Sequence, residues 1–251
     1  MSAGPSVRDE VDHPREQSNL EVVVRSVAAA SVAGALVGIV VGGIGGRLAM
    51  ALLAALNRED HGVLTDDGFT IGQFTVGGTV MLLAAAAQLG VTGGLVYLVL
   101  RRLALGPRWL RVLSLCVGVA VVLEALLLTP DGIDFTALDP SWLPVALFLA
   151  LPAVFVWLLA LLCEHWLAPD SWYATGPLRL VASTLLVCLV GGPVLVVLLV
   201  VAVVVGVAWR TVAAVAPDWS GAVAAWAGRV VCAAIGFWAL ATLVENVAAV
   251  A

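Results

Sequence analysis

The feature that most constrains the fold is a series of long apolar segments. They cover roughly residues 26–56, 75–100, 109–128, 142–164, 178–208 and 220–248. A helix needs about 20 predominantly apolar residues to cross a bilayer, because the hydrocarbon core is about 30 Å thick and a helix rises about 1.5 Å per residue. Each segment reaches that length. The sequence therefore predicts an all-α integral membrane protein, a bundle of six transmembrane helices.

The composition agrees with a membrane location and argues against several other classes. Hydrophobic residues make up 62% of the chain and charged residues 12%, whereas apolar residues, glycine included, are about half of a soluble domain. The net charge of -5 argues against a nucleic-acid partner, which would need a basic face. Each of the four cysteines stands alone in the sequence, so their spacing predicts neither a disulfide framework nor a metal site. We expect no resident metal or cofactor.

The chain divides into a tail and one membrane domain. Residues 1–21 are polar and carry mixed charges, which predicts a disordered tail, and residues 22–251 form the six-span domain. Positively charged residues collect on the cytoplasmic side of membrane proteins. Here the flanks of one side contain Arg8, Arg15, Arg25, Arg101, Arg102, Arg108, Arg111 and Arg179. Six crossings then place both termini in the cytoplasm, with the bundle in a bacterial plasma membrane.

Several stretches resemble a known family. They are "GGIGGRLAM", "TDDGFTIGQFT", "GGLVYLVLRR", "GPRW", "PDGIDFTALDPSWL" and "ALFLALPAVF". Together they resemble a family of uncharacterised multi-pass membrane proteins of GC-rich bacteria, over roughly residues 34–166. The resemblance implies the membrane topology, and it implies no activity and no catalytic or binding residues.

Glycines at four-residue spacing mark one helix surface. The stretch "GALVGIVVGGIGGRLAM" contains Gly34, Gly38, Gly42 and Gly46, and the next predicted helix contains Gly90 and Gly94 at the same spacing. In lipid, helices associate through close packing of small residues. We expect a glycine zipper between the first two helices. A homodimer seam and a flexible hinge are the alternatives.

Three ionisable residues inside the predicted spans fall at a similar depth near the outer surface. They are Arg47 of the first helix, Glu124 of the third and Arg229 of the sixth. A charge inside the bilayer is costly, so such groups pair, reach the interface or face water. The expectation is one network, which either lines an outward-facing vestibule or fixes helix positions. In both cases removal of Glu124 alone would strand Arg47 and be harmful.

The fifth predicted helix contains a break signal. In "VCLVGGPVLVV", Pro193 cannot donate to the helix ladder, and Gly191 and Gly192 weaken the same place, which predicts a kink or a break. Broken helices build some transporter sites, although glycine and proline are also frequent in ordinary membrane helices.

Glu164, at the inner end of the fourth helix, is expected to reach interface water without a buried role.

The outer loops are acidic. Their aspartates are Asp66, Asp67, Asp131, Asp134 and Asp139. Such groups could bind a divalent cation, or they could form a solvated surface, which we favour. The two loops share an Asp-Gly phrase that could come from duplication of a helical hairpin or from common turn chemistry.

Function can be narrowed only by class. No histidine is placed for a buried Ser–His pair and no catalytic motif occurs, so we expect no enzyme. The first hypothesis is a non-catalytic scaffold or accessory protein, whose partner is a second copy or another membrane protein. The second is a small-solute or ion permease or channel, with the outward-facing vestibule at Arg47, Glu124 and Arg229. Aliphatic runs such as "VLVVLLVVAVVVGVAW" leave few groups that could select a solute, which favours the scaffold.

Overall fold

The computed structural model describes residues 18–56, 75–104, 106–127, 142–186, 192–215 and 220–250. These residues form helices and no strand, so the all-α prediction is confirmed. The elements are α1 (Asn19–Val37), the π-helix η1 (Gly38–Gly45), α2 (Gly46–Leu56), α3 (Val76–Leu103), α4 (Arg108–Leu127), α6 (Trp142–Trp166), α7 (Trp172–Thr175), α8 (Leu178–Ser183), α9 (Gly192–Val215) and α10 (Ser220–Val250).

Local sequence signals explain where several helices begin. The Ser18 hydroxyl accepts a hydrogen bond from the Glu21 amide at 3.2 Å and caps α1. Because of this cap, α1 begins at Asn19, inside the segment predicted to be a disordered tail. Thr75 caps α3 in the same way. The turn between α3 and α4 requires a glycine, since Gly106 has a φ of 92°.

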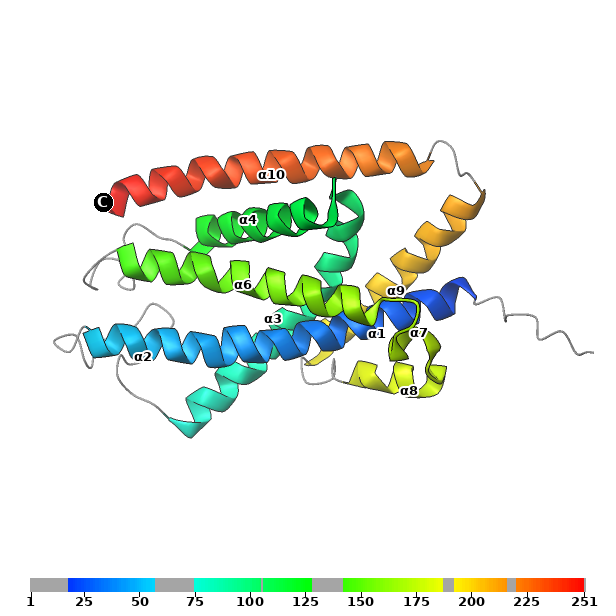
Figure 1. Ribbon diagram of the computed structural model, residues 1–251, viewed down its shortest axis with the longest axis horizontal. Coiled ribbons are helices and arrows are strands. Elements are labelled where there is room, and N and C mark those ends of the chain that lie inside the picture. The colour runs from blue at the N-terminus through cyan, green and yellow to red at the C-terminus, as the bar shows by residue number, and fades with distance from the viewer. Residues whose placement is uncertain are drawn as a thin grey trace, which may run out of the picture.

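α1, α2, α4, α6 and α10 lie roughly along the long axis of the molecule, whereas α3 and α9 cross them obliquely (Figure 1). α1, η1 and α2 form one continuous rod, which packs against α3, while α4 packs between α6 and α10. Small residues dominate the most buried positions of α1, including Ala28, Ala29, Ala30 and Ala33. The core therefore lies where α1 meets α3 and α6.

Four helical segments are long and apolar enough to cross a membrane. Among the described residues these are Asn19–Leu56, Val76–Leu103, Leu149–Trp166 and Ala225–Asn246. They correspond to the first, second, fourth and sixth predicted spans. The structure thus supports four candidate spans, and the count of six stays a prediction.

The fifth predicted span differs most from expectation. α8 ends at Ser183, a short 3-10 turn follows over 184–186, and the next described helix, α9, begins at Gly192. Residues 187–191, which include Gly191, lie outside the described part. The segment 178–208 was expected to be one span with a kink or break at 191–193, and the described residues form two separate helices, α8 and α9.

α9 also runs in the opposite direction to the helix that was predicted there. Later residues of α9 contact earlier residues of α1. Leu199 packs against Ala35, and Gly206 faces Val23. At its far end, the Arg210 Nε atom donates to Asn19 Oδ1 at 3.2 Å. α9 is therefore antiparallel to α1, whereas a fifth crossing would be parallel to it.

Because α9 runs opposite to the predicted fifth helix, α10 also runs opposite to the predicted sixth helix. Gly228 faces Leu103, so α10 starts beside the last residue of α3. Figure 1 shows α10 running from there in the same direction as α1, with the C-terminus at the opposite end of the molecule from Asn19. The two ends of the described chain thus lie at opposite ends of the bundle, which differs from the expectation that both termini lie on one side.

Candidate functional site at the arginine end

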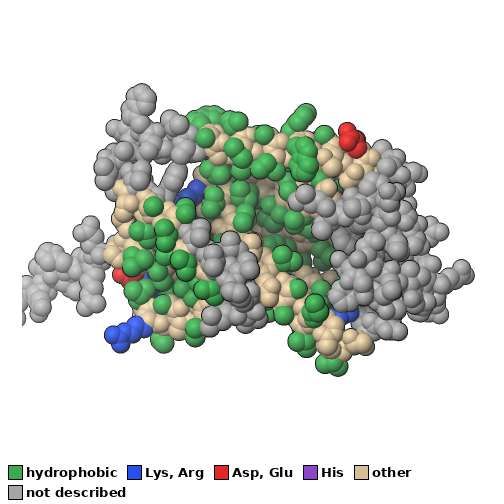
Figure 2. Space-filling view, turned by 180° about the vertical axis from the view of Figure 1, so that it is seen from behind, with side chains coloured by type: hydrophobic (Ala, Val, Ile, Leu, Met, Phe, Trp, Pro, Cys, Tyr) green, Lys and Arg blue, Asp and Glu red, His purple; other side chains and the backbone are tan. Residues whose placement is uncertain are grey.

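Basic residues gather at one end of the bundle. The structure describes nine arginines, and eight of them belong to the end where α1 begins and α3 finishes, which we call the arginine end: Arg25, Arg101, Arg102, Arg108, Arg111, Arg179, Arg210 and Arg229. Figure 2 shows hydrophobic side chains over the middle of the surface and basic side chains mainly toward this end. The ninth, Arg47, lies on α2.

The predicted network of Arg47, Glu124 and Arg229 does not form. The guanidinium of Arg47 lies next to Gly78, at the start of α3. The Arg229 Nε atom donates to the Leu103 carbonyl oxygen at 3.0 Å, at the other end of α3. This helix has 28 residues and is therefore about 40 Å long. The reason for the error is the reversed direction of α10, which carries Arg229 to the arginine end.

Glu124 is a deeply buried carboxyl group of α4. Its relative exposure is 1%, and neither carboxylate oxygen has a hydrogen-bond partner within the part of the chain that the structure describes. Glu124 therefore does not pair with Arg47. The expectation that its removal would strand Arg47 loses its basis.

The predicted glycines lie in the contact between α1, η1 and α3. A Cβ atom on Gly34 would overlap the carbonyl oxygen of Gly90, and one on Gly94 would overlap that of Ala30. Gly38 meets Ala86 and Gly90 in the same way, and a Cβ on Gly42 would lie 3.3 Å from Ala86 Cβ. Around Gly46, no atom of the described residues lies within 4 Å of the added Cβ position, so Gly46 takes no part in the seam with α3.

The seam extends beyond the predicted glycines. Ala30 and Ala86 continue the four-residue spacing on their own helices, and sequence reasoning missed them because only glycines were considered. η1 was also missed. Its sequence, GIVVGGIG, is rich in glycine, which tolerates departures from α-helical geometry.

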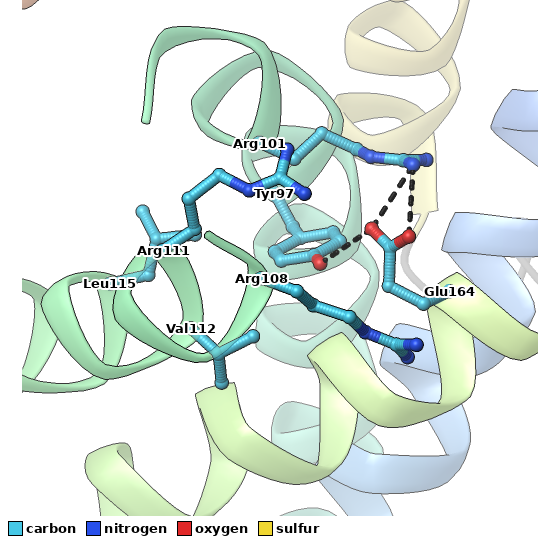
Figure 3. Close-up of a pocket in the computed structure, with 7 residues that line it drawn as sticks. All are labelled: Tyr97, Arg101, Arg108, Arg111, Val112, Leu115 and Glu164. Carbon is cyan, nitrogen blue, oxygen red and sulfur yellow. Dashed lines mark hydrogen bonds and ion pairs between the residues drawn. The ribbon is translucent and has the colours of Figure 1, made fainter. Parts of the chain in front are cut away.

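A polar cluster at the arginine end joins three helices. Glu164 on α6 accepts a hydrogen bond from the Tyr97 hydroxyl at 3.1 Å and pairs with Arg101 at 3.0 Å. Tyr97 and Arg101 lie one turn apart on α3 and so reach the same carboxylate. Figure 3 shows Arg108 and Arg111 of α4 beside this group. We call Tyr97, Arg101, Arg108, Arg111 and Glu164 the arginine pocket.

The turn between α3 and α4 positions the arginine pocket. Gly106 lets the chain reverse, and Pro107 precedes the first residue of α4. Arg108 and Arg111 then occupy the first turn of α4 on one face. Val112 and Leu115 complete the lining. The cavity volume is about 10 Å³, which is space for about one water molecule.

The arginine pocket has an excess of positive charge. Three guanidinium groups surround one carboxylate (Figure 3). Arg101 is paired with Glu164, whereas Arg108 and Arg111 form no ion pair with any residue that the structure describes. Guanidinium groups bind carboxylates and phosphates through two parallel hydrogen bonds. The pocket is therefore suited to an anion and not to a cation.

Sequence reasoning missed the role of Glu164. It was expected to reach interface water, but it holds α3 and α6 together. The available signal was the pair of arginines Arg101 and Arg102 at the end of one apolar segment, with a glutamate at the matching end of another. Only the charge of these arginines was used, as a sign of membrane orientation.

Other arginines at this end connect helices in a similar way. Arg25 pairs with Glu21 at 2.7 Å, and its Nη1 atom donates to the carbonyl oxygens of Tyr173 and Gly176 at 2.9 Å each. It thereby attaches α1 to α7. Arg229 lies 5.3 Å from the ring centre of Trp226 while it binds the end of α3. The arginine end is thus fastened by contacts between helices.

Some predicted site residues lie outside the described part. These are the loop aspartates Asp66, Asp67, Asp131, Asp134 and Asp139, together with Gly191. Gly192 begins α9, and Pro193 follows it, so the predicted break at 191–193 falls at the edge of the described part and stays a prediction.

Comparison with known proteins identified no relative of the chain. No family model, no curated protein and no solved structure matches the chain. The resemblance of residues 34–166 to uncharacterised membrane proteins stays a prediction.

Proposed function

We propose that the chain is an integral plasma-membrane protein that acts as a non-catalytic scaffold or accessory protein. The observation that carries this proposal is the use of polar side chains at the arginine end. Arg25, Arg101, Arg210 and Arg229 each bind a group on another helix. Polar groups used in this way fix the bundle, and a second copy or another membrane protein would be the partner.

The outer surface supports the membrane location. Only 6% of the apolar window of α10 is buried, and large apolar side chains such as Phe237, at 78% exposure, and Leu89, at 74%, face outward. Lipid tails would cover such side chains. Large numbers of exposed apolar side chains are unusual on the surface of a water-soluble protein. Because arginines favour the cytoplasmic side, we place the arginine end in the cytoplasm.

A permease is the second candidate, and Glu124 is the observation that favours it. Ionisable residues buried in membrane helices often belong to ion or proton pathways, and this carboxyl group has no described partner. The interruption between α8 and α9 adds a second transporter-like feature. A vestibule built from Arg47, Glu124 and Arg229 is not part of this candidate, because Arg47 and Arg229 lie at opposite ends of α3 and Glu124 pairs with neither.

Cysteine accessibility separates the two candidates. Glu124→Cys and, as a control at the arginine end, Arg179→Cys would be made in a background lacking Cys116, Cys163, Cys188 and Cys232. Inverted vesicles and intact cells would be treated with a membrane-impermeant maleimide. The scaffold predicts labelling of Arg179→Cys in inverted vesicles only and protection of Glu124→Cys in both. Labelling of Glu124→Cys in a folded variant would mean a water-filled path and would replace the scaffold by the permease.

A further inference from the structure

Two arginines of the pocket, Arg108 and Arg111, form no ion pair with a carboxylate of the described residues. Arg108 is exposed, Arg111 is partly buried, and both lie beside a carboxylate that Tyr97 and Arg101 already occupy. Figure 3 shows the three guanidinium groups arranged around Tyr97 and Glu164, with those of Arg101 and Arg111 on one side and that of Arg108 on the other. Because like charges repel one another, an anion placed between Arg108 and Arg111 would stabilise the three guanidinium groups.

The surroundings of these arginines are apolar on one side. Val112 and Leu115 line the pocket on the same helix. Nearby on α4, Trp109 is 67% exposed and Leu113 is 52% exposed. Tryptophan beside arginine at a helix end is typical of the membrane interface. A ligand here would meet positive charge at its head and apolar side chains along its length.

We propose that the arginine pocket binds the phosphate group of an anionic membrane lipid, held between Arg108 and Arg111 with the acyl chains along the exposed apolar side chains of α4. Basic pockets between membrane helices on the cytoplasmic side bind the head groups of anionic lipids. This inference rests on the proposed membrane location, with the arginine end at the cytoplasmic interface.

The size of the pocket places the phosphate at its rim. A cavity of about 10 Å³ holds one water molecule and is too small for a phosphodiester. The side chain of Arg108 is exposed and can turn toward a ligand outside the cavity. The pair formed by Arg101 and Glu164 then acts as the floor of the site and keeps α3 and α6 in place.

The test measures lipid binding by the purified full chain in a neutral detergent. Isothermal titration would use short-chain phosphatidylglycerol, with short-chain phosphatidylcholine and inorganic phosphate as comparison ligands. We expect binding of phosphatidylglycerol and much weaker binding of the other two. Equal binding of phosphatidylcholine would overturn the proposal, and so would a complete lack of phosphatidylglycerol binding. Inorganic phosphate that competes as well as the lipid would identify a site for a free anion instead.

Matched variants locate the site. Arg108→Gln together with Arg111→Gln should lower the affinity for phosphatidylglycerol by about tenfold or more, since each arginine near an anionic head group contributes to binding. Arg179→Gln removes one exposed charge from α8 at the same end, outside the pocket, and should change the affinity by less than about twofold. Equal losses in the double variant and in Arg179→Gln would indicate diffuse attraction and overturn the assignment, as would unchanged affinity in the double variant.

The membrane location is tested separately. Extraction of the chain from cell membranes by alkaline carbonate would contradict the proposed function, while the titration in detergent would still report on the pocket. The two failures are therefore distinguishable.

Discussion

Two glutamates on neighbouring helices have opposite surroundings. Glu164 of α6 is bound by Tyr97 and Arg101, whereas Glu124 of α4 is more deeply buried and has no partner among the described residues. Burial of a polar group costs free energy unless a hydrogen bond replaces its contact with water. At the scale of single residues, the carboxyl group of Glu164 therefore stabilises the folded chain, whereas that of Glu124 destabilises it.

Substitution by glutamine should reveal this difference. Glu124→Gln should leave the unfolding temperature in detergent unchanged or raise it, because no pair is lost. Glu164→Gln should lower it by the equivalent of about 1 kcal/mol, since a partly exposed ion pair with Arg101 is removed. Thermal unfolding followed by tryptophan fluorescence compares the two. A larger loss in Glu124→Gln would show that Glu124 has a partner in the folded chain.

At the scale of helices, the seam between α1 and α3 depends on the absence of side chains. Gly90→Ala should separate the two helices or shift them, because the added methyl group would overlap the Gly34 backbone. We expect a loss of at least about 2 kcal/mol in unfolding free energy, as for other overpacked positions. Gly46→Ala is the matched control, since nothing lies within 4 Å of its added Cβ.

The control should be neutral or slightly stabilising, because alanine favours helix by about 1 kcal/mol over glycine. Unfolding in denaturant measures both variants. Equal stability of Gly90→Ala and Gly46→Ala would contradict the close seam.

The direction of α9 can be tested by crosslinking. Val23→Cys combined with Gly206→Cys, in the background without the four native cysteines, should form a disulfide on mild oxidation because the two positions face each other. Val23→Cys with Val196→Cys should not, since residue 196 lies about 15 Å further along α9. Electrophoretic mobility reports the crosslink. Efficient bonding of the second pair would mean that α9 runs the other way.

At the scale of the whole molecule, hydropathy predicted where helices lie better than how they connect. The predicted segments 75–100, 109–128 and 220–248 differ from α3, α4 and α10 by only a few residues, because length and apolar content determine them. Hydropathy also gave one continuous apolar segment over 178–208. It could not detect that the chain turns back there, since a helix that returns is as apolar as one that crosses.

The candidate site was less predictable than the helices. Its members Tyr97, Arg108 and Glu164 come from three helices, and only the tertiary packing brings them together. Glu124 and Arg229 were placed at one depth by counting residues along crossings of assumed direction. One reversed helix was enough to separate them.

The arrangement of α10 predicts where the chain ends. The last described residues lie at the opposite end from Asn19 (Figure 1), so a reporter fused after Ala251 should face the outside of the cell. Alkaline phosphatase, which is active only outside the cytoplasm, should be active there and inactive at the N-terminus. A fluorescent protein should give the reverse pattern. Phosphatase that is inactive at both ends would restore the prediction of two cytoplasmic termini.

The arginine end also has a chemical consequence. The chain contains twelve arginines and no lysine. A guanidinium group keeps its proton throughout the pH range of a living cell, and lysine acetylation has no target here. The positive charge of these guanidinium groups is therefore permanent once the chain is made. Their attraction to one membrane leaflet can be tuned by the lipids that the cell supplies, and acidification of the cytoplasm leaves the guanidinium charge unchanged.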